Sequence, residues 1–344
     1  MFSLATLRRG ATDRYLLVCM VWALVASSGC GAQARSFWSV GAARPDVEDW
    51  VEVREDWLRV MTDGHGQTAA RLSRRLIWFD SLLVGVTGYS RRPSHDFHVV
   101  MLRSRDAYRH FVPGKPTGGV HVDGEHGSLA IVDASRQTRS ARILLFHEYV
   151  HGFFSGLDGP HVPHWYEEAM AEYMSWAVVD DERIVLGGPV ETAVPALRAG
   201  AWMSLASLLT IDPSDRAYRD RSVDGDYHAS AWALLHYLRL AMPGGRDVLE
   251  QYLELVGFGL PSVHAMEQAS MMRLEDLERS VHAHIASGDL PAETLPAKAF
   301  RISRPRVTPR AMSAADVNDL FSSLETLRAT WAEQEEQRDR DGAS

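Results

Sequence analysis

Residues 143–153 read Ile-Leu-Leu-Phe-His-Glu-Tyr-Val-His-Gly-Phe, and this stretch decides the fold. His147 and His151 stand four positions apart, so on a helix both imidazoles lie on one face. Neutral imidazole is a good zinc ligand, and Glu148 on the adjoining flank is placed to accept a proton from a metal-activated water. The H-E-x-x-H spacing therefore predicts a zinc site with hydrolytic chemistry.

The alternative to a metal site is coincidence. In a chain with 15 His, an H-E-x-x-H sequence arises by chance with a probability of roughly 5 %. The residues around the two histidines are uncharged and no proline interrupts them, as a helix buried around a metal requires. These residues are Leu144, Leu145, Tyr149, Val150, Gly152 and Phe153. Other parts of the chain have to support the motif.

Length and composition indicate a folded protein. The 344 residues suffice for one large domain or two smaller ones, and 46 % hydrophobic with 24 % charged residues is ordinary for a soluble protein. The formal net charge is -9. Removal of residues 1–29, which carry three Arg and one Asp, changes it to about -11. This acidic balance argues against a nucleic-acid partner, which would favour a basic face.

The N-terminus has the pattern of an export signal. Arg8, Arg9 and Arg14 form a basic region, and residues 15–26 form a short apolar run followed by small residues. A run of this length is too short to span a bilayer as a mature helix. We therefore expect residues 1–29 to be a signal peptide.

Two processing sites follow the signal. Residues 27–30, Ser-Ser-Gly-Cys, resemble a bacterial lipobox, although Ser27 replaces the usual Leu. Cys19 lies within the apolar run, so Cys30 is the one cysteine left after cleavage, and lipidation would give it a use. Residues 30–45 would then be a tether to a membrane at the cell envelope. The alternative is cleavage at Ala-Gln-Ala, residues 32–34, which would release a soluble secreted or periplasmic protein.

The chain before the motif predicts an α/β lead-in. Alternating or β-branched runs indicate strands at residues 49–53, 57–61, 97–102, 120–122 and 129–132. Helical spacing of apolar residues indicates helices at residues 66–83 and 106–111.

The chain after the motif offers a further ligand. Pro163 is a natural first residue for a helix that continues to residue 173, and acidic residues suit its first turns. Glu168 follows His151 by 17 positions, so a helix, a turn and a return helix could bring its carboxylate to the metal. Glu172, one turn further, could accept the free N–H of a ligating histidine.

These two segments together resemble the gluzincin, or peptidase-MA-like, zinc metallopeptidases. The return helix of that family commonly reads P-x-W-L-x-E-G-x-A-E-Y, and residues 163–173 read Pro-His-Trp-Tyr-Glu-Glu-Ala-Met-Ala-Glu-Tyr. The resemblance implies that Glu168 is the third metal ligand and that Glu172 supports the site. Ala169 replaces the family's Gly, and Glu167 replaces a neutral residue, so we expect Glu167 to be solvated.

The resemblance also implies an architecture. We expect an α+β, zincin-like fold in which a small mixed sheet is followed by a mostly helical half carrying the H-E-x-x-H helix. The catalytic module would comprise residues 46–290, and residues 291–344 would be a linker and a C-terminal amphipathic helix. The apolar stripe of that helix is expected to dock on the chain's own domain, and it consists of Val317, Leu320, Leu324, Leu327 and Trp331.

Residues 226–238 resemble the family's Y-x-x-S/A-W-x-L-V-x-Y-L helix, and residues 202–209 resemble a segment after its metal site. Relatives place a tyrosine or histidine near the start of that helix to stabilise the oxyanion. The resemblance therefore implies this role for Tyr227, with His228 as the second candidate.

The predicted function is hydrolysis of peptide bonds. Zinc would be held by His147, His151 and Glu168, with Glu148 as the general base acting on a peptide or protein substrate. One alternative is an exported lipoprotein that uses the same fold to bind peptides or a cell-envelope component without turnover. The presence of Glu148 argues against it, since binding alone has no need of a base. Hydrolysis of another bond is a further alternative, because fold does not fix substrate.

Overall fold

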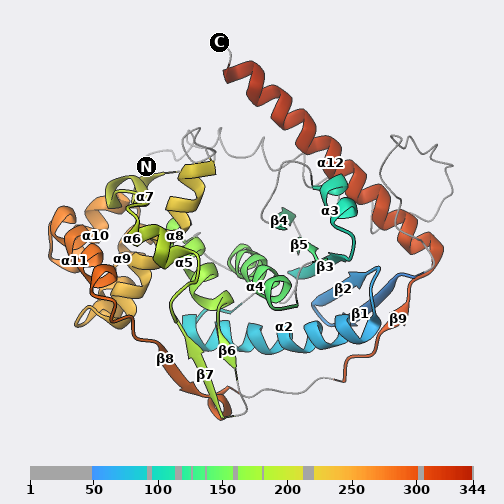
Figure 1. Cartoon of the computed structure of the whole chain (residues 1–344), viewed down its shortest axis with the longest axis horizontal. Coiled ribbons are helices and arrows are strands. Elements are labelled where there is room, and N and C mark those ends of the chain that lie inside the picture. Colours follow the sequence, from blue (N-terminus) through green and yellow to red (C-terminus); the bar gives the residue numbers. More distant parts are fainter. Residues whose placement is uncertain are drawn as a thin grey trace, which may run out of the picture. The chain divides into compact units, whose positions relative to one another are not determined.

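The computed structural model describes most of the chain after the N-terminal segment. The described residues are 49–90, 95–112, 118–124, 127–135, 138–157, 162–179, 182–211, 221–300 and 306–342. The expected signal peptide, Cys30 and the tether lie outside them. The fold is mixed α+β, as expected (Figure 1).

Contacts divide the chain into two compact units. The first consists of Met1–Arg75, Pro93–Ala141 and Pro305–Ser344, and the second of Leu76–Arg92 and Arg142–Arg304. Helices α2 (Gly66–Thr87) and α4 (Thr138–Ser155) each begin in the first unit and continue into the second.

The first unit contains a six-stranded sheet in the order β4-β5-β3-β2-β1-β9. Pairs β2·β3 and β3·β5 are parallel and the other pairs are antiparallel, so the sheet is mixed. The strands are β1 (Val51–Glu55), β2 (Leu58–Thr62), β3 (Asp96–Leu102), β4 (Gly119–Gly124), β5 (Gly127–Asp133) and β9 (Arg310–Ala311). Five of them were expected from their apolar patterns, and the two-residue strand β9 was not.

The two neighbouring strands β3 and β5 in this sheet are largely buried. All residues of β5 are buried, and so are the last four residues of β3. Parallel strands covered on both faces have this continuous apolar character. Helix α3 (Arg105–Phe111) follows β3 and begins at Ser104, whose side chain accepts a hydrogen bond from the backbone N–H of Ala107.

The C-terminal helix α12 (Ala314–Gly342) packs on its own unit beside α3 (Figure 1). Phe321 meets Trp50 edge to face, with ring centroids 5.4 Å apart, and stacks on Phe111. The predicted docking of the apolar stripe is confirmed: Val317, Leu324 and Leu327 are buried in this core, and Leu320 and Trp331 pack against it.

The second unit is mostly helical. Besides the later parts of α2 and α4 it contains α5 (His164–Ser175), α6 (Ala193–Arg198), α7 (Leu205–Thr210), α8 (Arg221–Leu240), α9 (Gly245–Gly257), α10 (Ser262–Ser270) and α11 (Leu274–Ser287). Helices α5 and α8 pack closely on each other (Figure 1). Among the described residues, none of the helices combines the length and the apolarity needed to cross a membrane.

Aromatic contacts fix the helix of the H-E-x-x-H motif. Phe146 stacks on Phe79 of α2 at a centroid distance of 4.1 Å, and the Tyr149 hydroxyl donates a hydrogen bond to Asp80. Stacked aromatic pairs add stabilisation beyond the area they bury. These contacts occupy one face of α4 and leave the face of the two histidines for α5.

A small antiparallel sheet of the second unit was not expected from the sequence. It is formed by β6 (Val178–Val179), β7 (Arg183–Leu186) and β8 (Glu293–Pro296), followed by a short 3₁₀ turn, η1 (Ala297–Ala299). Glu293 in β8 accepts hydrogen bonds from Tyr173 of α5 and Arg239 of α8. The strand is thereby bonded to the two helices that build the site.

Candidate metal centre

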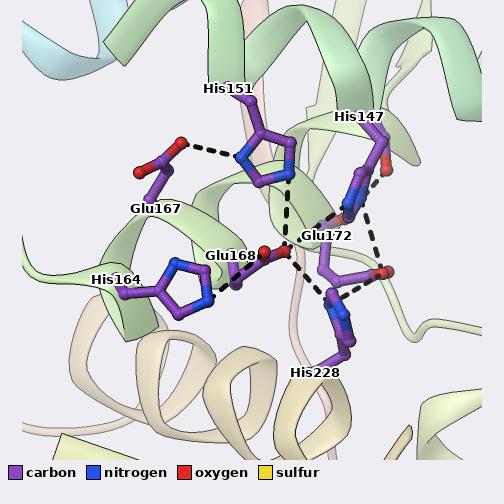
Figure 2. A network of polar contacts seen from close by, with 8 residues as sticks. His147, His151, His164, Glu167, Glu168, Glu172 and His228 are labelled. Carbon is purple, nitrogen blue, oxygen red and sulfur yellow. Dashed lines mark hydrogen bonds and ion pairs between the residues drawn. The ribbon is translucent and has the colours of Figure 1, made fainter. Parts of the chain in front are cut away.

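Three side chains predicted as metal ligands converge in the second unit. His147 and His151 project from the same face of α4 with ring centroids 5.0 Å apart, and Glu168 faces them from α5 (Figure 2). Glu168 Oε2 lies 3.5 Å from His147 Nε2 and 3.5 Å from His151 Nε2. The return helix therefore brings its carboxylate to the two imidazoles.

The spacing of these atoms fits a shared cation. With bonds of 2.0–2.1 Å to a tetrahedral ion, ligand atoms lie about 3.4 Å apart. Glu168 Oε2 is buried and meets the geometry of a hydrogen bond with none of the described groups, although ring nitrogens surround it. A buried carboxylate needs a cationic partner, and a cation at the centre of the three groups would supply one. Two imidazoles and a carboxylate therefore fit a divalent cation.

A carboxylate faces the Nδ1 atom of each of the two histidines. Nδ1 of His151 lies 2.7 Å from Glu167 Oε1, so its N–H donates to Glu167 and Nε2 is left for a cation. The expectation that Glu167 is solvated is wrong, because only 22 % of its side chain is exposed. Glu172 Oε1 faces His147 Nδ1 at 3.6 Å, on the side where the sequence predicted a supporting carboxylate.

The charges of the cluster shift its ionisation. Burial lowers the pKa of His151, but the carboxylates of Glu168, Glu167 and Glu148 outweigh burial and raise the pKa above its ordinary value. Burial raises the pKa of Glu168, but His151 and His228 outweigh it and hold the pKa well below its ordinary value. Without a metal the cluster is an imidazolium and carboxylate network, and a cation has to displace its protons.

The two candidates for the oxyanion role occupy different environments. Tyr227 is fully buried, and its ring stacks on His164 at 5.4 Å. His228 Nδ1 lies 3.2 Å from Glu168 Oε2 and 4.0 Å from Glu172 Oε1 (Figure 2). Neighbouring residues on a helix point about 100° apart, so the two side chains face different parts of the cluster. The structure puts the second candidate, His228, beside the predicted ligands.

Sequence reasoning missed His164 as a member of the cluster. A histidine in a loop before a helix is most often exposed, but His164 is the first residue of α5 and 22 % of its side chain is exposed. Its Nε2 lies 3.7 Å from Glu168 Oε1, and burial lowers its pKa. The spacing of four residues between His164 and Glu168 was the signal that could have identified it.

Glu148 and Ala169 are both buried. Glu148 is buried on α4, next to His147 in the sequence, and its charge contributes to the raised pKa of His151. Ala169 is fully buried on α5, in keeping with a small residue at a close helix contact. The cluster thus combines three groups that could hold a cation with a carboxylate, Glu148, that is able to accept a proton.

No protein-family model matches the sequence, and the search of curated proteins also gave no match. The interpretation of the site therefore depends on its geometry and chemistry.

Proposed function

We propose that the protein is a zinc-dependent peptide-bond hydrolase of the gluzincin type, and that its mixed α+β fold is zincin-like. The observation that carries this proposal is the convergence of His147, His151 and Glu168 around one point. Glu148 follows His147 on α4, and its charge acts on His151. Helices α4 and α5 supply these groups in the order that the H-E-x-x-H motif and a return helix require.

The donor set favours zinc as the cation. Zinc binds both imidazole nitrogen and carboxylate oxygen, and catalytic zinc sites use three protein ligands and leave one position open. A bound zinc ion would supply a Lewis acid that polarises the substrate carbonyl and makes water more acidic. Glu167 and Glu172 hold the rings of His151 and His147 in the orientation that exposes Nε2.

The protein's own groups carry the proton transfers. Glu148 accepts the proton of the attacking water and passes it to the leaving amine. His228 donates an N–H to the carbonyl oxygen as that oxygen gains negative charge. We assign this role to His228 in preference to Tyr227, because His228 borders Glu168 and Tyr227 is buried against His164.

We also propose export and anchoring through Cys30. The sequence supports both, with a basic and apolar leader followed by Ser-Ser-Gly-Cys at residues 27–30. Labelling with radioactive fatty acid is expected to mark the wild-type protein and to fail for Cys30→Ala. A labelled Cys30→Ala variant would contradict the anchor, and an unlabelled wild type found in soluble form would favour cleavage at residues 32–34.

The peptidase proposal is tested with a mixed peptide library and mass spectrometry. The zinc-loaded wild type should cleave peptides, and Glu148→Gln should retain zinc while its rate falls by about 10²-fold or more. If both proteins hold stoichiometric zinc and neither changes the library, the peptidase proposal fails. That result would support a protein that uses the same site to bind peptides or an envelope component.

A further inference from the structure

His147 belongs to two groups of potential ligands. Its Nε2 faces Glu168, and its Nδ1 faces Glu172 Oε1 at 3.6 Å. Glu172 Oε1 is in turn 4.0 Å from Nδ1 of His228. His147, Glu172 and His228 each offer one ligand atom within 4.8 Å of the other two, as do His147, His151 and Glu168. The second group therefore meets the same spacing test as the first.

The two groups differ in exposure. Glu168 is 7 % exposed and His151 is 13 % exposed, whereas Glu172 and His228 are 20 % and 24 % exposed. The group of His147, Glu172 and His228, called the outer group here, lies nearer to solvent. Its ligand atoms are an imidazole pair and a carboxylate, the same chemistry as the inner group of His147, His151 and Glu168.

We propose that the outer group is a second, weaker binding site for zinc or a similar divalent cation, joined to the first through the ring of His147. The inner ion uses Nε2 of this ring, and the outer ion takes the place of the proton on Nδ1. The outer site is weaker because it needs that proton to leave and because its other ligands are more exposed. At low metal concentration Glu172 instead serves the inner site as a hydrogen-bond acceptor.

The second ion would not take part in the same chemical step as the first. Two ions on opposite nitrogens of one imidazole are separated by roughly 6 Å, given zinc–nitrogen bonds of about 2 Å. Hydrolytic sites in which two ions share the reacting groups have separations of about 3.5–4 Å. The consequence, which rests on the proposed function, is that the outer ion inhibits hydrolysis. It does so because it holds His228 away from the substrate carbonyl.

The direct test is a metal titration of the full chain after removal of metal with a chelator. Competition with chromophoric chelators should resolve two equivalents in the wild type, the second about tenfold or more weaker. Glu172→Gln and His228→Gln should lose the second equivalent and keep the first. Glu250→Gln is the control, since Glu250 is an exposed carboxylate on α9 outside both groups. It should keep both equivalents, and circular dichroism checks that each variant is folded.

A measurement on the wild type alone keeps the proposal testable if a variant does not fold. With Co²⁺ in place of zinc, the second equivalent should alter the electron paramagnetic resonance spectrum of the first, because one imidazole ring couples the two ions. A spectrum that only doubles in intensity would overturn the proposal. So would a single equivalent up to millimolar metal, or a second equivalent that persists in both outer-group variants.

These results are separable from the peptidase proposal. A protein that cleaves peptides with one ion, and binds no second one, contradicts the outer site alone. A protein that binds two ions as described but cleaves nothing contradicts the peptidase proposal alone.

Discussion

Oε1 of Glu167 lies 2.7 Å from Nδ1 of His151, so α5 supplies both a ligand for the predicted cation and the group that orients another ligand. Glu167 and Glu168 are consecutive, and they point to different parts of the cluster because neighbours on a helix diverge by about 100°. The resulting carboxylate–histidine pair fixes the tautomer of His151 and makes Nε2 the available nitrogen.

Removal of this carboxylate should weaken metal binding. Glu167→Ala is expected to raise the dissociation constant of the first zinc ion by about 10–100-fold, because the ring of His151 loses the group that orients it. Glu167→Gln, which keeps an acceptor oxygen, should have a smaller effect. The measurement is chelator competition, with Glu250→Ala, an exposed carboxylate on α9, as the control. Equal affinity for Glu167→Ala and wild type would contradict the assigned role.

The choice between the two oxyanion candidates has a kinetic test. His228→Gln should lower kcat on a cleavable peptide by about 10²–10³-fold while the first zinc ion stays bound. Tyr227→Phe should change kcat only slightly, because its ring packs on His164 within the core. The reverse pattern, with Tyr227→Phe inactive and His228→Gln active, would return the role to the residue first expected from the sequence.

The buried His236 should make stability depend on pH. His236 is fully buried, its Nε2 donates to the Pro291 carbonyl at 3.0 Å, and its Nδ1 is 2.9 Å from Nε2 of His284. Burial, together with the charge that His284 can carry, lowers the pKa of His236 from 6.5 to about 4. His236 therefore binds a proton more strongly in the unfolded chain than in the folded chain. The contribution of His236 to the free energy of unfolding is complete above pH 6.5. It is lost as the pH falls toward 4, by about 3 kcal/mol at most.

Urea unfolding of wild type and His236→Gln between pH 7.5 and 4.5 measures this effect. The free energy of unfolding should fall less steeply with pH in the variant. The difference between the two slopes isolates His236, because burial also lowers the pKa of His98 to about 4 and both proteins retain His98. Parallel pH dependences would show that His236 is not the group responsible.

Two adjacent glycines provide a test of the packing around Tyr173. Gly187 has φ +65°, and a Cβ there would lie 2.2 Å from Cε2 of Tyr173, whereas a Cβ on Gly188 would have no atom of the described residues within 4 Å. Gly187→Ala should lower the free energy of unfolding by about 2–4 kcal/mol, through backbone strain and a clash with a buried ring. Gly188→Ala should stay within about 0.5 kcal/mol of wild type. Equal stabilities for the two variants would contradict the placement of Tyr173.

Local patterns predicted most of the fold. Apolar alternation located five strands of the large sheet, and helical spacing located α2 and α3 to within a few residues. The sequence did not predict β6, β7, β8 and β9. Two of these strands have only two residues, and the pairing of β7 with β8 joins segments more than 100 residues apart. A strand that short has no period to detect, and its partner is set by the tertiary fold.

The sequence predicted those parts of the site that depend on a residue pattern within one helix. The spacing of His147 and His151 and the return-helix pattern around Glu168 each depend on a single element. The contact of Glu167 with His151 depends on the rotation of α5 against α4, which the sequence does not state. For the same reason the pattern could name the pair Tyr227 and His228 but not decide which of them faces Glu168.

The central claim is that His147, His151 and Glu168 bind one zinc ion, and X-ray absorption with metal analysis tests it most directly. The wild type at one equivalent should show zinc bound only by nitrogen and oxygen, including two imidazoles, and Glu168→Gln should bind zinc about 10²-fold or more weakly. A wild type that retains no zinc after loading, or a Glu168→Gln variant with unchanged affinity and spectrum, would contradict the account.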